Sequence, residues 1–259
     1  MSKLAAITRA VGPALAHCEL TFIEREPIDV ARAAEQHDAY CTALRAAGVS
    51  VFTLPAAENL LDAVFVEDAA VVLDEIAIVT RPGIDSRRIE VDAVAAVLAL
   101  HRRTACIEVP GSLEGGDVLR IGRRLFVGRS TRTNDSGLRQ LASIVKPLGY
   151  DVVQVGVHGC LHLKTAVTAL SRDTLLVNPG WIDTEILDGF RHVAVAADEP
   201  FAANTLTLDG IVYISAKWNR TRRNLENAGF TTKAMNISEL EKAEAGLTCL
   251  SIIFRSGDS

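Results

Sequence analysis

The residues best suited to catalysis in this chain of 259 residues are a cysteine near its end and a histidine in its second half. Cys249 follows Gly246-Leu247-Thr248, and the apolar run Leu250 to Phe254 comes directly after it. We predict that this run is a buried strand with the thiol held at its mouth. A thiol, an imidazole and spare carboxylates could together form a nucleophilic enzyme that acts on a cationic carbon centre.

The histidine, His162, lies between two leucines. On a strand, His158, Cys160 and His162 would share one face, which raises the question of a metal site. Gly159 argues against a regular strand, and three ligands at strand spacing rarely converge on one ion, so we expect no metal. A buried structural histidine and a general acid are the two remaining interpretations.

Two acidic segments could bind a planar cation. Glu67 and Asp68 follow an apolar segment, so we predict that they end a buried strand and point to opposite sides. With Asp62 they would form a concentrated acidic site suited to a guanidinium, although a loop at a strand end would also account for them. Glu114 precedes Gly115-Gly116-Asp117, a predicted tight turn that could bring its carboxylate next to the histidine.

Arginines could bind the other end of such a ligand. Arg87 and Arg88 open a predicted helix, where a solvated pair is the usual interpretation. Arg132 lies just before another predicted helix, and an arginine fork there could bind a carboxylate bidentately. A site with acidic groups at one end and arginines at the other would fit a ligand that is an amino acid with a cationic side chain.

Composition limits the class of protein. With 49% hydrophobic residues, 23% charged residues and a net charge of −5, the chain is typical of a globular enzyme and unlike a nucleic-acid-binding protein, which needs a basic surface. No apolar run approaches the ~18 residues of a membrane span, and we expect neither a membrane partner nor a secretory signal. Five scattered cysteines, an odd number, favour reduced thiols in the cytoplasm, with Cys41 and Cys106 expected to be buried.

Short apolar strands alternate with amphipathic helices along the whole chain. The predicted helices are 27–47 (capped by Asp29 and ended by Gly48), 88–100, 134–148, 182–190, 221–228 and a short one with a capping box at Ser238 and Glu241. The predicted strands are 51–54, 70–73, 76–80, 106–109, 125–127, 152–155 and 231–235, with others near 168, 175, 193, 206 and 212. Roughly five strand-helix units, with a period of about 40–50 residues, predict an architecture closed around an axis. A doubly wound sheet is the alternative, but the first turns lack a GxGxxG loop.

These segments, in this order, resemble the dimethylarginine dimethylaminohydrolase family of the guanidine-modifying pentein superfamily. The matching segments include Val64 to Asp68, Ser86 to Arg88, Gly115 to Leu119, Arg132 to Asn134, Leu161 to Lys164 and Leu247 to Cys249. The resemblance implies an α/β fold, a five-bladed α/β propeller with a pseudo-five-fold repeat, forming a single catalytic domain over residues 1–259. The segment 12–26, which should cover the substrate, matches least, and Thr205 stands where relatives often carry cysteine.

The resemblance also implies roles for individual residues. Cys249 would attack the guanidinium carbon, His162 would protonate the departing amine and then activate water, and Glu114 would orient and charge-balance His162. Asp68 and the backbone at Glu67 would hold the guanidinium. The residues implied at the amino-acid end are Arg87 and Arg132 for the α-carboxylate, with Leu20, Asp62 and the backbone of Ala243 around it. No metal or organic cofactor is implied.

The predicted activity is hydrolysis of Nω-methylated L-arginine, monomethyl or asymmetric dimethyl, to L-citrulline and methylamine or dimethylamine through a covalent cysteine thiouronium. The alternatives are a related hydrolase of L-arginine or L-citrulline and, in another class, a non-catalytic ribosome-binding factor. Arginine deiminases usually carry an inserted helical domain for which this chain has no room, and the ribosome-binding penteins lack the Cys–His pair. The expected partner is a small molecule, and a homodimer is compatible with the sequence.

Overall fold

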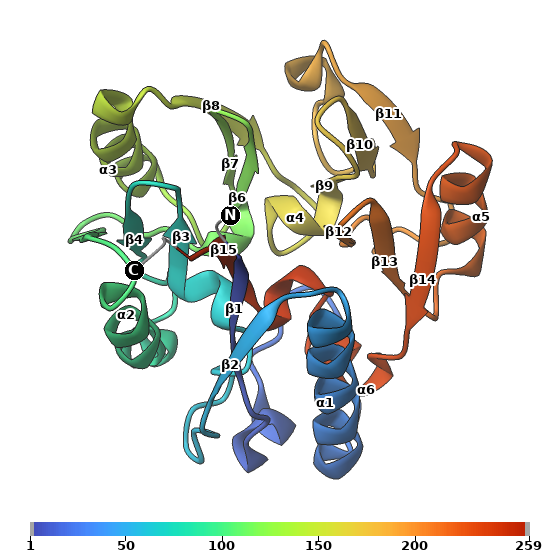
Figure 1. Ribbon diagram of the computed structural model, residues 1–259, viewed down its shortest axis with the longest axis horizontal. Helices are drawn as coiled ribbons and strands as arrows, with labels where there is room; N and C mark the ends of the chain where they lie inside the picture. Colours follow the sequence, from blue (N-terminus) through green and yellow to red (C-terminus); the bar gives the residue numbers. More distant parts are fainter. Residues whose placement is uncertain (1–2, 257–259) are drawn as a thin grey trace.

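The computed structural model describes residues 3–256, which form five three-stranded sheets arranged as the blades of a ring (Figure 1). In each blade an inner strand pairs antiparallel with a middle strand, and the middle strand pairs in parallel with an outer strand. A parallel pair needs a crossover connection, which here runs along the outside of the ring through a helical segment. The predicted five-bladed α/β propeller is therefore confirmed.

The elements follow one another regularly along the chain. In chain order the strands are β1 (Leu4–Arg9), β2 (Ser50–Leu54), β3 (Ala70–Val72), β4 (Ala77–Val79), β5 (Thr104–Cys106), β6 (Val118–Ile121), β7 (Arg124–Arg129), β8 (Asp151–Gly156), β9 (Val167–Ala169), β10 (Thr174–Val177), β11 (Arg191–Ala194), β12 (Leu206–Leu208), β13 (Ile211–Ser215), β14 (Thr231–Met235) and β15 (Ile252–Arg255). The α-helices are α1 (Val30–Ala46), α2 (Val91–Ala99), α3 (Asp135–Val145), α4 (Leu163–Ala166), α5 (Asn219–Asn227) and α6 (Ser238–Glu241). The 3₁₀ segments are η1 (Pro13–His17), η2 (Val66–Ala69), η3 (Asp85–Glu90), η4 (Gly115–Asp117), η5 (Lys146–Leu148), η6 (Thr184–Leu187) and η7 (Thr248–Leu250).

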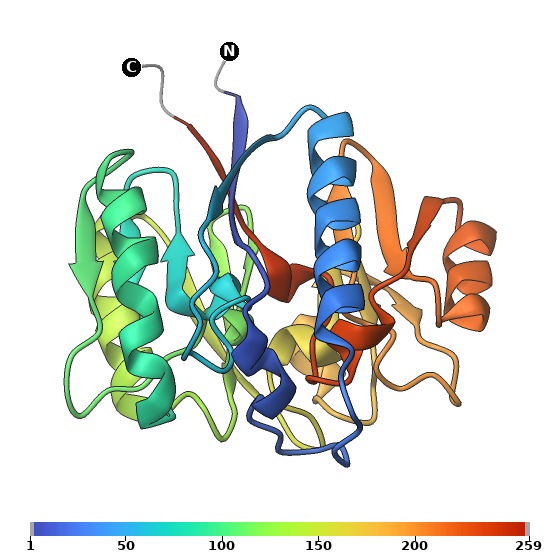
Figure 2. The ribbon, with the colours of Figure 1, turned by 90° about the horizontal axis from the view of Figure 1, so that it is seen from below.

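The two ends of the chain share one blade, which closes the ring. β15 pairs antiparallel with β1, so that Ile7 lies opposite Ile252, and β1 pairs in parallel with β2. Figure 2 shows β1 and β15 leaving the same face of the molecule side by side. Because β15 is the inner strand of this blade, the turn that precedes it, including Cys249, lies near the centre of the ring.

Hydrophobic packing joins each blade to the next. The buried apolar side chains form five clusters, and each cluster contains residues from two neighbouring blades. Phe126 of β7, for example, is fully buried and contacts Phe190 edge-to-face at 5.8 Å between ring centroids. The inner strands surround a central cavity of about 310 Å³. The ring is thus stabilised by burial of apolar area between blades, the largest favourable contribution to folding in most proteins.

Most predicted helices are confirmed, because their terminal signals act locally. Asp29 caps α1 by accepting the Arg32 N–H, and Gly48 follows the helix with a φ of 80°. Asn134 caps α3 in the same way by accepting the Gly137 N–H. The predicted helix 182–190 is wrong: only η6 forms there, and Gly189, at a φ of 92°, ends it.

Several short elements near the centre differ from prediction. β1 and β6 were not predicted as strands. The expected strand before Glu67 is an irregular segment leading into η2, and the expected strand after Cys249 begins only at Ile252. The predicted capping box is absent, since Ser238 is the first residue of α6 and its side chain caps nothing. These segments turn sharply at the axis, and tertiary contacts outweigh their strand propensity there.

The cysteines are all free thiols. Cys41 is buried in α1 as predicted, but Cys106 is exposed at the end of β5, because β5 is the outer strand of its blade. Among residues 3–256, no helix has both the length and the apolar character needed to cross a membrane.

A buried hydrogen bond ties α1 to the C-terminal strand, and its removal should destabilise the fold. The hydroxyls of Tyr40 and Ser251 lie 2.6 Å apart, and both residues are buried. We expect Tyr40→Phe to lower the free energy of unfolding by about 1–2 kcal/mol, because Ser251 loses its partner. Urea unfolding should show that the double variant Tyr40→Phe/Ser251→Ala loses less free energy of unfolding than the sum of the losses in the two single variants. Fully additive losses would show that the two hydroxyls are not coupled.

Candidate active site

A small pocket of about 20 Å³ near the centre of the ring collects most of the predicted site residues. The predicted residues that line it are Asp62, Asp68, Arg87, Arg132, His162, Ala243 and Cys249. Glu114 contacts the imidazole of His162, and Glu67 lines the central cavity. Leu20 belongs to the segment that runs past the pocket, where the Glu19 N–H donates to Asp62 at 3.3 Å. Residues far apart in sequence therefore meet at one place.

Cys249 lies on a tight turn, not at a strand mouth as the sequence suggested. It is the middle residue of η7, and its Sγ accepts the Gly246 N–H at 3.4 Å. The preceding Thr248 is fixed from two sides, by Asn204 and by the Glu67 carboxylate, whose oxygen accepts the Thr248 hydroxyl at 2.6 Å. A side chain on such an anchored turn has little freedom to move away from the pocket.

The surroundings of Cys249 favour the neutral thiol. Burial raises the pKa of the thiol well above its usual range, and the negative charges of Glu67 and Asp68 raise it further. The Gly246 N–H and Lys164 act in the opposite direction but do not compensate. With only protein groups around it, the sulfur therefore carries its proton at neutral pH and needs a further positive charge to become a nucleophile.

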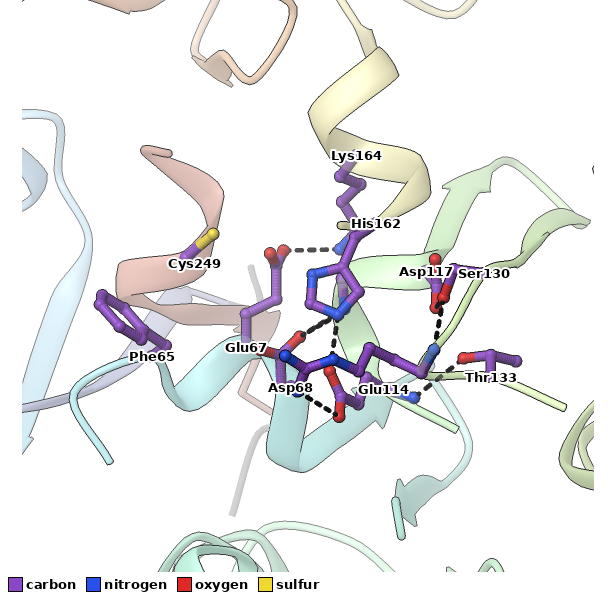
Figure 3. Close-up of polar contacts among 12 residues, drawn as sticks. Phe65, Glu67, Asp68, Glu114, Asp117, Ser130, Thr133, His162, Lys164 and Cys249 are labelled. Carbon is purple, nitrogen blue, oxygen red and sulfur yellow. Dashed lines mark hydrogen bonds and ion pairs between the residues drawn. The ribbon is translucent and has the colours of Figure 1, made fainter. Parts of the chain in front are cut away.

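His162 is the residue immediately before α4. Its backbone is extended, but it is not part of a strand. Asp117 holds the start of this helix, because its carboxylate accepts the Leu163 N–H at 2.9 Å and the Ser130 hydroxyl at 2.6 Å. The imidazole Nε2 lies 2.6 Å from an oxygen of Glu114, as Figure 3 shows. The predicted proximity of Glu114 and His162 is therefore present.

His162 is a cation at neutral pH in this arrangement. Burial alone lowers the pKa of the imidazole, but the charge of Asp68, the hydrogen bond that His162 donates to Glu114 and the charge of Asp117 outweigh burial and raise the pKa to about 9. His162 is correspondingly able to donate a proton at pH 7. Asp68 responds in the opposite sense: burial raises the pKa of its carboxyl, but His162 and Arg87 outweigh burial and lower it to about 2.

Gly116 allows the acidic turn to approach the histidine closely. Its N–H donates to Asp68 at 2.9 Å, and a Cβ at this position would lie 2.7 Å from Nδ1 of His162 and 2.8 Å from Asp68. Any side chain would force these groups apart. The glycine pair before Asp117 is therefore explained by close approach of the backbone and not only by a turn.

Arg87 is buried among four carboxylates. Its guanidinium lies 2.8 Å from Asp68, 3.0 Å from Glu90, 3.7 Å from Glu114 and 4.0 Å from Asp62. Its second Nη also donates to backbone carbonyls at 3.4 and 3.5 Å. Arg87 is therefore already engaged within the protein and neutralises the acidic cluster from inside, whereas the sequence suggested a solvated residue at a helix start.

Arg132 is buried too, but it is incompletely paired. Its Nη2 donates to the Thr21 hydroxyl at 3.1 Å, while its buried Nη1 has no hydrogen-bond partner among residues 3–256 and lies 3.7 Å from Glu114. A buried guanidinium with a free donor facing a pocket is a natural binding group for a carboxylate.

The Glu67 side chain lines the central cavity and is held there by two hydrogen bonds. One of its oxygens accepts a hydrogen bond from Lys164 Nζ at 2.6 Å (Figure 3). The other oxygen accepts the Thr248 hydroxyl. Lys164, Thr248 and Asp117 were not among the predicted site residues, although each belongs to a segment that the sequence analysis singled out. Lysine, threonine and aspartate at such positions are too common to be recognised without the fold.

One group within residues 3–256 has the geometry to hold a metal ion, namely Asp68, Glu114 and His162, whose ligand atoms lie within 4.8 Å of one another. These atoms are already paired: Glu114 with His162, and Asp68 with Gly116 and Arg87. Arg87 supplies the positive charge that a metal ion would otherwise provide. The arrangement fits an acid–base group better than a metal centre. His158, Cys160 and His162 do not lie on a strand in the described part of the chain, so the strand face considered in the sequence analysis does not form.

Comparison with known proteins identifies the family. Residues 20–228 match the family model described as N,N dimethylarginine dimethylhydrolase, eukaryotic. The N(G),N(G)-dimethylarginine dimethylaminohydrolase of Streptomyces coelicolor is 39% identical over 256 residues, covering 98% of each chain. The solved enzyme from Pseudomonas aeruginosa, a cysteine-to-serine mutant complexed with citrulline, is 32% identical with a TM-score of 0.91 over 98% of this chain and 100% of that chain. A histidine-to-glycine dimethylarginine dimethylaminohydrolase carrying an S-methyl-L-thiocitrulline adduct has a TM-score of 0.93 at 32% identity, with the same coverage.

The ring of five blades, with a thiol and an imidazole in its central pocket, defines a guanidine-modifying enzyme of the pentein superfamily. Within that superfamily, the chain belongs to the dimethylarginine dimethylaminohydrolase family.

The pairing of Glu114 with His162 predicts the protonation state of the histidine. In Glu114→Gln the charged hydrogen bond becomes a neutral one, so the pKa of His162 should fall from about 9 toward the ordinary histidine value. NMR titration of the imidazole measures this shift directly. We also expect kcat at pH 8 to fall by about 10²-fold or more, as for loss of a general acid. An unchanged histidine pKa would show that Asp68 and Asp117 suffice.

Proposed function

We propose that this protein hydrolyses the guanidinium C–N bond of Nω-methylated L-arginine, releasing L-citrulline and methylamine or dimethylamine. The observation that carries the proposal is the pocket itself, in which a thiol, an imidazolium and buried carboxylates surround one small space. Membership of the dimethylarginine dimethylaminohydrolase family supports the same reaction, as do the relatives complexed with citrulline and with a thiocitrulline adduct.

Cys249 is the nucleophile in this proposal. The substrate cation enters beside Glu67 and Asp68, and its charge offsets theirs, so that the thiol releases its proton to solvent. The thiolate then gives an electron pair to the guanidinium carbon. The bond from this carbon to the methylated nitrogen breaks with its electron pair on nitrogen, and that nitrogen takes a proton from His162. The product of this half-reaction is a covalent thiouronium.

His162 acts in both half-reactions. With a pKa of about 9 it is protonated when the amine departs, and the amine would be a poor leaving group without that proton. The resulting neutral imidazole accepts a proton from water as the water oxygen bonds to the same carbon. The C–S bond then breaks and its electron pair returns to sulfur. The remaining hydroxyl proton passes to that sulfur as the carbonyl group of citrulline forms, so that the neutral thiol of Cys249 is restored. Glu114 orients the ring throughout and balances its charge.

The remaining residues bind the ends of the substrate. Asp68 and the backbone at Glu67 hold the guanidinium, and Arg132 binds the α-carboxylate through its unpaired Nη1. Arg87 completes the carboxylate site if it exchanges one of its present contacts for the substrate. The residues proposed at the amino-acid end are Leu20, Asp62 and the backbone of Ala243. The reaction requires no metal or organic cofactor.

We also propose that residues 1–259 act as one catalytic domain, because the C-terminal β15 completes the blade that β1 begins and the pocket uses residues from Asp62 to Cys249. A homodimer and a cytoplasmic location stay predictions.

A substrate panel tests the reaction. We expect citrulline to form from monomethylarginine and asymmetric dimethylarginine, and far more slowly from symmetric dimethylarginine and arginine. We expect Cys249→Ser to lower kcat by at least about 10⁴-fold while its unfolding curve is unchanged. Activity on arginine alone would move the reaction to a deiminase. A Cys249→Ser variant with full activity would refute the nucleophile.

The charge of the substrate should lower the pKa of the thiol, and this can be measured without turnover. The thiolate absorbance of the wild type, minus that of Cys249→Ser, should rise only at alkaline pH in the free protein. Because burial and two carboxylates raise the pKa of Cys249, millimolar methylguanidinium should shift this rise to lower pH. Ammonium at the same concentration and ionic strength is the control. Identical titrations with and without methylguanidinium would contradict substrate-assisted ionisation.

A further inference from the structure

A segment without regular structure passes over the pocket that contains Cys249. Residues 18–29 lie outside any helix or strand, between η1 and α1. Glu19 of this segment lines the pocket, and Ile23, Glu24 and Glu26 line a larger cavity of about 390 Å³ next to it. Figure 2 shows the η1 end of the chain on the face opposite to the two termini. Within residues 3–256, the hydrogen bonds that hold Glu19 to Phe22 in position all involve a side chain.

The strongest of these contacts is made by Glu244. One carboxylate oxygen accepts the Thr21 N–H and the other accepts the Phe22 N–H, each at 2.7 Å. A carboxylate that accepts two adjacent backbone N–H groups makes two charge-assisted hydrogen bonds at once. Without Glu244 these two N–H groups have no other partner among the contacts of the described residues.

The backbone at Glu244 is unusual as well. Its φ is 58°, in the left-handed region that non-glycine residues seldom occupy. Glycine would adopt this conformation freely, but it would have no carboxylate for the segment. A charged residue at a position where the backbone favours glycine suggests that the side chain itself is needed.

The Glu244 contact connects three parts of the site. The turn from Ala243 to Gly246 lies on the pocket wall and donates the Gly246 N–H to the sulfur of Cys249. Thr21, held by Glu244 through its N–H, accepts a hydrogen bond from Arg132 through its hydroxyl at 3.1 Å. One residue of the segment thus lies between the turn that carries the thiol and the arginine that is free to bind a carboxylate.

The pocket is too small for an arginine side chain in this arrangement. A space of about 20 Å³ holds roughly one water molecule. Substrate binding therefore requires that part of the wall move aside and that side chains in the pocket rearrange around the substrate before the wall closes again. The blades are fixed by strand pairing and by the buried clusters, whereas Thr21 and Phe22 are exposed and held by Glu244. Moving this segment therefore requires less free energy than moving any blade that forms the wall.

The family resemblance already implies that this segment covers the substrate; we propose that Glu244 is the positioning residue that holds Glu19–Phe22 closed over Cys249, through its hydrogen bonds to the Thr21 and Phe22 N–H groups. The proposal rests on the proposed function for the identity of the substrate, but not for the closing contact itself. Closure over bound substrate would place Thr21 against Arg132 and exclude water from the thiouronium until the amine has left.

Three measurements on Glu244→Gly test the proposal. Hydrogen exchange of the amides of Thr21 and Phe22 should become about tenfold faster, because both lose a charged acceptor. Alkylation of Cys249 by iodoacetamide, followed on the Cys249 peptide by mass spectrometry, should accelerate by a similar factor at fixed pH. KM for asymmetric dimethylarginine should rise about 5- to 10-fold with kcat changed less than about twofold, as expected when binding is weakened uniformly.

The choice of glycine separates closure from overall stability. Because glycine relieves the left-handed backbone, it offsets part of the stability that is lost with the two hydrogen bonds. Urea unfolding of each variant measures the remaining loss, and alkylation faster than that loss allows comes from local opening and not from global unfolding. Glu244→Gln, which keeps one acceptor oxygen, should give intermediate exchange and alkylation rates. Glu24→Gln removes the same charge two residues beyond Phe22, where the Glu24 side chain makes no hydrogen bond to any described residue, and this variant should behave as the wild type.

Wild-type exchange and alkylation rates in both Glu244 variants would overturn the proposal. So would equal effects of Glu24→Gln, since the cause would then be net charge. If the wild type failed to turn over methylarginines, the proposed function would fall, but the exchange and alkylation results would still decide the role of Glu244.

Discussion

The structure depends on burying several carboxylates next to one another at the centre of a ring. Asp62, Glu67, Asp68 and Glu114 are all at least nine-tenths buried, and isolated charges of one sign would be very unfavourable there. Buried cations offset them: Arg87 contacts several at once, His162 pairs with Glu114, and Lys164 pairs with Glu67. The same balance keeps the thiol neutral and the imidazole charged. A substrate that brings one more positive charge to this cluster would reverse the state of the thiol.

The fold meets this requirement through the ends of its inner strands. Each blade contributes an inner strand to the axis, and the irregular turns beside these strands carry η2, η4, α4 and η7. Asp68, Glu114, His162 and Cys249 lie on or beside these four segments. Gly116 permits two of the segments to come within contact distance. The blades form the rigid scaffold, and the turns carry the polar side chains of the site.

Local sequence signals predicted the outer parts of the fold well. Helices α1 and α3 begin at capping residues and end near glycines, which act over a few residues and need no tertiary context. The same reasoning failed toward the axis, where the segments before Glu67 and around Cys249 carry apolar residues typical of strands but form 3₁₀ turns. It also failed for Cys106, because an apolar strand does not reveal whether it lies inside or at the edge of a sheet.

The sequence by itself determined the chemical groups of the site, the repeated strand-helix order and, through ordered motifs, the family. It determined these because residue type and local spacing are written directly in the chain. Only the tertiary structure decided that Arg87 is an internal counter-ion, that Asp117 fixes the helix beside His162, and that Glu244 binds the segment over Cys249. Glu244 and Thr21 are 223 positions apart, and no local pattern can indicate a contact across that separation. Such contacts follow from closure of the ring, which depends on packing between all five blades.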